Sequence, residues 1–293
     1  MENKVYPRIK DAILLCLLLL AIQIGMQIFI VVFRVIYNAI SQVIYNLFYD
    51  DSLSVDVLLP AGILTTLISI FTFGLVLLVG FQKTGRKFNE VFKFNKVPMF
   101  LWFATTVFIA GFVIVTSEID NLFSYILPVP EWFSKLFEVL MTDQILILAI
   151  ISVGIIPAFT EELFFRGLIL DGLKNNYSKR KAIVISALLF GLIHLNPWQF
   201  YGAFIIGLIS AWICIETNSI LLCIYIHLFN NTLCTVAVKY RELIPIKGFN
   251  TNFSTTVEFQ PLWFDLTGLA ILAVGTLMLI RGLKKSEACA VTE

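Results

Sequence analysis

Long apolar runs recur along almost the whole chain, and most of them are long enough to cross a membrane. A helix rises 1.5 Å per residue, so about 20 apolar residues span the ~30 Å hydrocarbon core of a bilayer. About eight stretches reach or approach this length. They cover residues 11–33, 57–81, 99–117, 144–173, 182–195, 199–215, 218–238 and 263–281. The sequence therefore predicts an all-α, polytopic membrane bundle of about eight transmembrane helices.

The composition agrees with a membrane protein and excludes a soluble one. Hydrophobic residues make up 59% of the chain and charged residues only 14%, whereas soluble domains are about 25% charged. The net charge of +1 leaves no basic surface for a nucleic acid, so we expect a lipid bilayer as the surroundings. We divide the chain into N-terminal helices with a basic loop (1–143), a membrane core (144–238), and a last loop, helix and tail (239–293).

The charges of the loops predict the orientation of the bundle. Lys and Arg gather in the N-terminus, in residues 82–98, in 174–181 and in the tail, whereas the intervening segments 50–56 and 118–143 are acidic. Positively charged loops remain in the cytoplasm, so both termini should be cytoplasmic. The loop 239–262 departs from this pattern, because it contains Lys239, Arg241 and Lys247 on the side predicted to be outside.

Two imidazoles, two carboxylates and a guanidinium lie within the predicted spans 144–173, 182–195 and 218–238. They are the only two histidines, His194 and His227, together with Glu161, Glu162 and Arg166. An ionisable group at bilayer depth is costly and is by default a functional residue with a partner. Counting along the helices places the glutamates ~17 Å, His194 ~20 Å and His227 ~14 Å from the basic side. Three helices thus bring polar groups to a similar depth, which predicts one shared site.

Helical spacing predicts how these groups divide their roles. Glu162 and Arg166 are four residues apart, so they share a helix face and can form an ion pair. Glu161 projects about 100° away from Glu162 and is left available as a base. His227 and Asn231 are also four residues apart, and an imidazole beside an amide donor is a plausible oxyanion hole.

These residues also match a known pattern. Glu161 to Arg166 fits E-E-x-x-x-R, Phe190 to His194 fits F-x-x-x-H, and His227 to Asn231 fits H-x-x-x-N. In this order and on separate spans, the three motifs resemble the CAAX-protease and bacteriocin-processing family, the glutamate-type intramembrane proteases that include the eukaryotic CAAX prenyl endopeptidase and abortive-infection proteins. The resemblance covers about residues 144–235.

The resemblance implies a mechanism and a location. Glu161 would activate a water held with the help of His194, His227 and Asn231 would stabilise the oxyanion, and Glu162 with Arg166 would orient the site. The expected reaction is hydrolysis of a peptide bond in a membrane-associated protein or peptide that reaches the site from the cytoplasmic side. The expected location is the plasma membrane of a bacterium.

Three alternatives remain open at this stage. Two histidines and a glutamate could bind zinc, but the spacing is not H-E-x-x-H and the family resemblance favours a site without a metal, so we expect no cofactor. A non-catalytic bacteriocin-immunity or scaffold protein could keep the same fold. A transporter could use the same buried residues, but it predicts inverted repeats, and the two halves show no convincing repeat.

Overall fold

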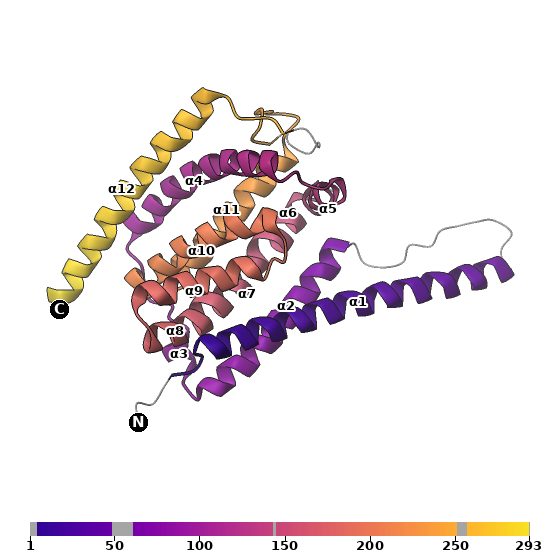
Figure 1. The fold of residues 1–293 in the computed structure, drawn as a ribbon, viewed down its shortest axis with the longest axis horizontal. Helices are drawn as coiled ribbons and strands as arrows, with labels where there is room; N and C mark the ends of the chain where they lie inside the picture. The colour runs from indigo at the N-terminus through magenta and orange to yellow at the C-terminus, as the bar shows by residue number, and fades with distance from the viewer. Residues whose placement is uncertain (1–4, 49–60, 143–144, 251–256, 293) are drawn as a thin grey trace.

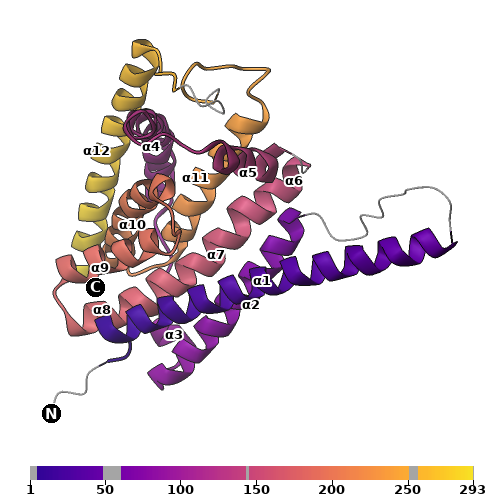
Figure 2. The ribbon, with the colours of Figure 1, turned by 45° about the vertical axis from the view of Figure 1, so that its right-hand side comes forward.

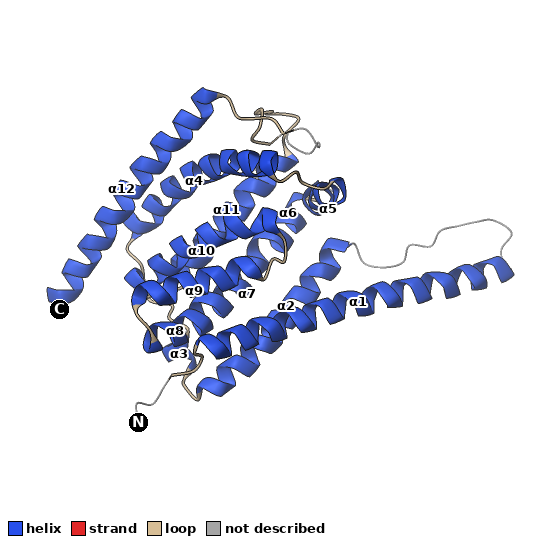
Figure 3. Cartoon of the chain, in the orientation of Figure 1, coloured by secondary structure: helices blue, strands red, loops and turns tan. Residues whose placement is uncertain are grey.

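The computed structural model describes residues 5–48, 61–142, 145–250 and 257–292, and in this part of the chain helices are the only extended elements (Figure 3). The helices outside the predicted core are α1 (Ile9–Phe48), α2 (Ala61–Thr84), α3 (Phe88–Val91), α4 (Met99–Ile126), α5 (Glu131–Thr142) and α12 (Leu262–Thr292). The core contains α9 (Lys179–Leu192), α10 (Pro197–Thr217) and α11 (Leu221–Lys239). It begins with one composite helix made of α6 (Leu146–Ala149), η1 (Ile150–Ile155), α7 (Ile156–Glu162), η2 (Leu163–Ile169) and α8 (Leu170–Asn176).

The prediction of a polytopic helical bundle is confirmed. Seven helices of the described residues are long and apolar enough to cross a membrane. The fifth predicted span, 182–195, corresponds to α9, which has only 14 residues. That length is about 21 Å, short of a full bilayer core.

The helices lie side by side in three groups. In Figures 1 and 2, α4 and α12 form one side, α9, α10, α11 and the composite helix form the middle, and α1 and α2 form the other side. The first turn of α1 and the last turn of α12 lie at the same end of the bundle (Figure 1). The middle group contains the predicted functional residues, which therefore lie between the two outer pairs of helices.

The first helix is longer than the predicted span 11–33. It runs for 40 residues from Ile9 to Phe48, about 60 Å and twice the thickness of a bilayer core. Arg34 had suggested a boundary, but a single charge does not end a helix, and no Pro or Gly follows it before Phe48. The second half of α1 projects away from the other helices (Figure 1).

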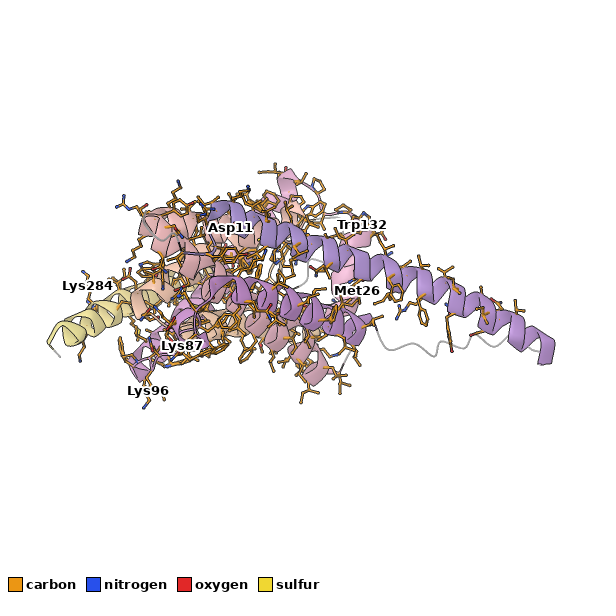
Figure 4. The ribbon with its side chains drawn as sticks, turned by 90° about the horizontal axis from the view of Figure 1, so that it is seen from below. Asp11, Met26, Lys87, Lys96, Trp132 and Lys284 are labelled. Carbon is orange, nitrogen blue, oxygen red and sulfur yellow. The ribbon has the colours of Figure 1, made fainter. Side chains whose placement is uncertain are left out.

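Basic residues from distant parts of the sequence lie at one end of the bundle. Figure 4 shows Lys87, Lys96 and Lys284 towards this end, whereas Trp132 lies towards the other. We call the first of these the basic end. There Asp171 of α8 forms ion pairs with Arg86, which follows α2, and with Lys174 at 3.3 Å. The pair with Arg86 fastens the loop after α2 to the composite helix.

Helices α4 and α12 approach each other closely because glycines lie between them. A Cβ atom added to Gly111 would lie 2.2 Å from the backbone nitrogen of Leu272. A Cβ added to Gly275 would lie 2.4 Å from the backbone nitrogen and Cα of Phe108. Small residues let helix backbones pack directly in membranes, where the hydrophobic effect does not drive helices together.

Replacement of Gly275 by Ala should therefore separate the two helices. Because the added methyl group meets backbone and not a movable side chain, we expect Gly275→Ala to destabilise the protein by about 1–3 kcal/mol. The measurement is thermal unfolding of the purified protein in detergent. Gly74→Ala in α2 is the matched control, since nothing lies within 4 Å of a Cβ there. Equal unfolding temperatures for the two variants would contradict this packing.

Candidate active site

The two glutamates lie on a short α-helical segment between two π-helical turns. η1 precedes α7 and η2 follows it, and α7 ends at Glu162. π-helical turns are rare in proteins, and those that occur often lie at functional sites. Pro157 near the start of α7 has no N–H, so the carbonyl of Val153, four residues earlier, lacks its usual α-helical donor. Asn231 of α11 donates its side-chain amide to this carbonyl at 2.9 Å, which docks α11 on the composite helix.

Glu162 is the centre of a buried charged group. Its Oε2 lies 3.1 Å from Nε of Arg166, and its Oε1 lies 3.0 Å from Nδ1 of His227. The side chains of Glu162 and Arg166 are 1% and 0% exposed, respectively. A buried charge is tolerated only when it is paired and hydrogen-bonded. The predicted ion pair is therefore present, and it also holds the imidazole of His227.

Phe190 packs against the other side of this group. The guanidinium carbon of Arg166 lies 4.4 Å from the centre of the Phe190 ring, in the geometry of a cation–π contact. The same ring meets the rings of His194 and His227 edge to face, with centroid distances of 5.4 and 5.8 Å. Arg166 also donates to the carbonyl of Gly207 at 3.3 Å. Phe190 thus fixes both histidines relative to the arginine.

His194 lies in a turn and not within a helix, which corrects the predicted span 182–195. α9 ends at Leu192, and α10 begins at Pro197 after Asn196, whose side chain accepts from the backbone N–H of Gln199 at 2.8 Å. Asn196 also donates to the carbonyl of His194 at 2.8 Å. Leu195 between them has a φ of 56°, a strained value for a residue with a side chain.

A cavity of about 570 Å³ joins four of the six predicted site residues. Glu161, His194, His227 and Asn231 line it. Oε2 of Glu161 is buried there, and within the described residues it has no hydrogen-bond partner. Glu162 and Arg166 are not among the lining residues and lie behind His227. The structure thus separates an unpaired carboxylate at the cavity from a paired one behind it.

The cavity extends from the histidines away from the basic end. Its wall includes the later part of α4, the beginning of the composite helix, the first half of α10 and the second half of α11. All four of these segments are the parts of their helices farther from the basic end. On the predicted orientation this is the outer half of the membrane, which is at odds with the expectation that the substrate arrives from the cytoplasmic side.

Among the further polar residues of the cavity, Asp120 and Tyr201 form a pair that was not predicted as part of the site. Asp120 was assigned to a loop after a span ending at residue 117, but α4 continues to Ile126 and includes it. The hydroxyl of Tyr201 donates to Asp120 at 2.6 Å, and both residues line the cavity. The sequence offered little signal for this pair, because the two residues lie on different helices and match none of the three motifs.

The carboxylates and imidazoles do not converge as a metal site. Among the described residues, no group of three or more His, Cys, Asp or Glu side chains is placed to hold a metal ion. Glu161 and the two histidines share the cavity but not a common point. The donor arrangement therefore does not fit the three-ligand zinc site that the sequence left open.

Comparison with known proteins finds a similarity to one family model, and it lies in the core. Residues 143–233 match the family model described as Rce1-like, type II CAAX prenyl endopeptidase Rce1-like. This match confirms the resemblance of the three motifs and covers nearly the same residues. No curated protein and no solved structure matches the chain.

Loss of the guanidinium of Arg166 should leave a buried carboxylate without its main counter-charge. We expect Arg166→Met to destabilise the protein by about 3 kcal/mol, the usual cost of removing one partner of a buried pair. The double variant Glu162→Gln, Arg166→Met removes both charges and should recover more than half of this loss. Thermal unfolding in detergent measures both effects.

The control for this comparison is the ion pair between Lys135 and Glu131 on α5. Its side chains are 68% and 66% exposed and its N–O distance is 2.6 Å. Lys135→Gln should leave the unfolding temperature unchanged, because exposed pairs contribute little. If the double variant unfolds as early as Arg166→Met, the charge of Glu162 is not what destabilises the single variant.

Proposed function

Because residues 143–233 match the Rce1-like CAAX endopeptidase domain, we propose that this integral membrane protein is an endopeptidase that hydrolyses peptide bonds with a water activated by Glu161. The observation that supports this proposal most directly is the buried Oε2 of Glu161, which faces the cavity without a partner among the described residues. A carboxylate in this position is free to accept a proton. The two imidazoles and the amide of Asn231 share the same cavity.

Glu161 and His194 would hold and activate the water. Nδ1 of His194 lies 3.0 Å from the carbonyl oxygen of Phe190. A carbonyl only accepts, so Nδ1 carries the hydrogen, and in the neutral ring Nε2 is then an acceptor. Nε2 can accept one hydrogen of the water while Glu161 removes the other. The water oxygen then attacks the carbonyl carbon of the scissile peptide bond.

Asn231 and His227 would stabilise the oxyanion that this attack creates. Asn231 uses one hydrogen of its amide for the carbonyl of Val153, and the second hydrogen remains for the oxyanion. Nδ1 of His227 donates to Glu162, so His227 can donate to the oxyanion only when Nε2 is also protonated. Glu162, whose other oxygen pairs with Arg166, would stabilise the positive charge of that imidazolium.

The second half of the reaction returns the proton. Glu161 now carries the proton taken from the water, and it passes this proton to the amide nitrogen as the C–N bond breaks. The products are a carboxylic acid and an amine, and Glu161 is again ionised. No covalent enzyme intermediate forms, and the protons balance without a cofactor.

The position of the cavity supports entry from the outer half of the membrane. The basic residues that predict the cytoplasmic side gather at one end (Figure 4), and the cavity extends away from that end. We therefore keep the predicted orientation, with both termini in the cytoplasm, and replace the expectation of cytoplasmic access. The substrate would be a membrane-associated or exported peptide segment at the outer face of a bacterial plasma membrane.

The conservative variant Glu161→Gln tests the chemistry. Since the amide keeps the shape but cannot accept the proton, we expect cleavage to fall by a factor of at least about 10². Comparison of the membrane peptidome of cells with the wild type and with Glu161→Gln should reveal accumulated precursors and name the substrate. Glu216→Gln, an acid outside the cavity that pairs with Lys179, is the matched control.

The same comparison separates the rival functions. An immunity or scaffold protein would keep its biological effect in Glu161→Gln, and no precursor would accumulate. A transporter would move a solute across reconstituted vesicles without cleaving any peptide. Either result would overturn the proposed hydrolysis.

Cysteine labelling tests the side of access. In a variant whose own cysteines are replaced by alanine, Gln199→Cys lies in the cavity and Glu216→Cys lies at the opposite end of α10. A membrane-impermeant maleimide added to intact cells should label Gln199→Cys and leave Glu216→Cys unlabelled until the membrane is opened. The reverse pattern would restore cytoplasmic access.

A further inference from the structure

The cavity has an excess of negative charge. Two carboxylates line it, Asp120 and Glu161, and its lining includes no Lys or Arg. The remaining polar groups are neutral amides, hydroxyls and the two imidazoles. A cleft with one sign of charge and low-dielectric walls focuses its field on the ligand. The cavity therefore favours a cationic ligand.

Asp120 is available to such a ligand. It accepts from Tyr201 through Oδ1 at 2.6 Å, and it forms no ion pair with any Lys or Arg in the part of the chain that the structure describes. Its side chain is exposed at the cavity. The hydrogen bond from Tyr201 fixes the carboxylate, while Oδ2 has no donor among the described residues. The charge is thus positioned but not compensated.

Two aromatic residues of α10 also line the cavity. Tyr201 lies beside Asp120, and three residues earlier Nε1 of Trp198 donates to the carbonyl of Leu127 at 3.1 Å, which fixes the indole. Aromatic faces attract cations, most of all when these are partly removed from water. A carboxylate next to fixed aromatic rings is a combination that suits the ammonium or guanidinium group of a side chain.

Asp120 lies between Glu161 and the end of the bundle from which the cavity is entered. It follows Phe112, Val113 and Thr116 along α4 in the direction away from the basic end. The volume of about 570 Å³ falls in the usual range of ligand pockets. An extended peptide that reaches Glu161 therefore passes Asp120, and one of its side chains lies beside it.

We infer that Asp120 is a specificity-determining residue that binds a Lys or Arg side chain of the substrate close to the scissile bond. This inference rests on the proposed function, because it assigns a substrate class to the same cavity. A metal ion is a poorer occupant, since among the described residues Asp120 belongs to no group of three His, Cys, Asp or Glu side chains. The charged pair forms directly through Oδ2.

The test measures binding apart from cleavage. The full chain with Glu161→Gln in lipid nanodiscs is titrated with three fluorescent hexapeptides, blocked at both ends and differing only in a central Lys, norleucine or Glu. We expect the Lys peptide to bind about fivefold to tenfold more tightly than the norleucine peptide, as for a partly desolvated charge pair. The Glu peptide should bind most weakly.

Three further variants show whether Asp120 causes the preference for the Lys peptide. Addition of Asp120→Asn should reduce the Lys-to-norleucine ratio to about one, while Tyr201→Phe, which keeps the charge, should preserve most of it. Glu131→Gln, at the same end of the bundle but outside the cavity lining, should leave the ratio unchanged. An unaltered ratio in the Asp120→Asn background overturns the inference.

Other outcomes also decide the matter. If none of the peptides binds, or if micromolar Ca²⁺ or Mg²⁺ removes the preference for Lys, Asp120 does not bind a substrate side chain. Cleavage by the wild type with no Lys preference in binding would keep the proposed endopeptidase and reject this inference. A Lys preference that depends on Asp120, without any cleavage by the wild type, would keep the cationic-peptide site and reject the proposed hydrolysis.

Discussion

The buried carboxylate of Glu162 connects the helices of the middle group to one another. It holds Arg166 on its own helix and His227 on α11, and Arg166 reaches Phe190 of α9 and the carbonyl of Gly207 in α10. Four helices are therefore connected through one ionised group. In a low-dielectric interior the loss of any of these contacts is costly, because it leaves a buried charged or polar group without a partner.

This arrangement gives two adjacent glutamates different chemical roles. Glu162 has its charge compensated by Arg166 and does not line the cavity, whereas Glu161, one residue earlier, lines the cavity with an oxygen that has no hydrogen-bond partner among the described residues. The helix itself creates the difference, since successive side chains project about 100° apart. A group that must stay ionised to orient its neighbours cannot also accept a proton during the reaction. Separation of the two roles therefore follows from their positions on α7.

Much of this could be predicted because a membrane limits the possible structures. Apolar length predicted the spans, and the rarity of charge within them singled out Glu161, Glu162, Arg166, His194 and His227, since only functional or paired groups tolerate that depth. The i, i+4 spacing correctly predicted the ion pair between Glu162 of α7 and Arg166 of η2, and the shared face of His227 and Asn231 on α11. Residues on one helix have a fixed relative geometry, so such relations can be inferred from spacing alone.

Relations between helices could not be inferred in the same way. The hydrogen bond from Asn231 to the carbonyl of Val153 forms because Pro157 has no N–H to donate to that carbonyl and because α11 packs against this segment. The turn at His194 depends on Asn196, which ends α9 and caps α10. Asp120 looked like a loop residue because hydropathy falls before α4 ends. Each of these features arises from contacts between distant segments, which local periodicity does not encode.

The extent of α4 also links the fold to the direction of access. Helices in a bilayer end at the membrane surface only on average, and α4 continues past the apolar run to Ile126. Its polar residues Thr116, Ser117 and Asp120 line the cavity, where polar side chains are tolerated because they do not face lipid. The proposed hydrolysis requires water at Glu161, and these polar residues of α4 would line the path of that water from the end opposite the basic loops.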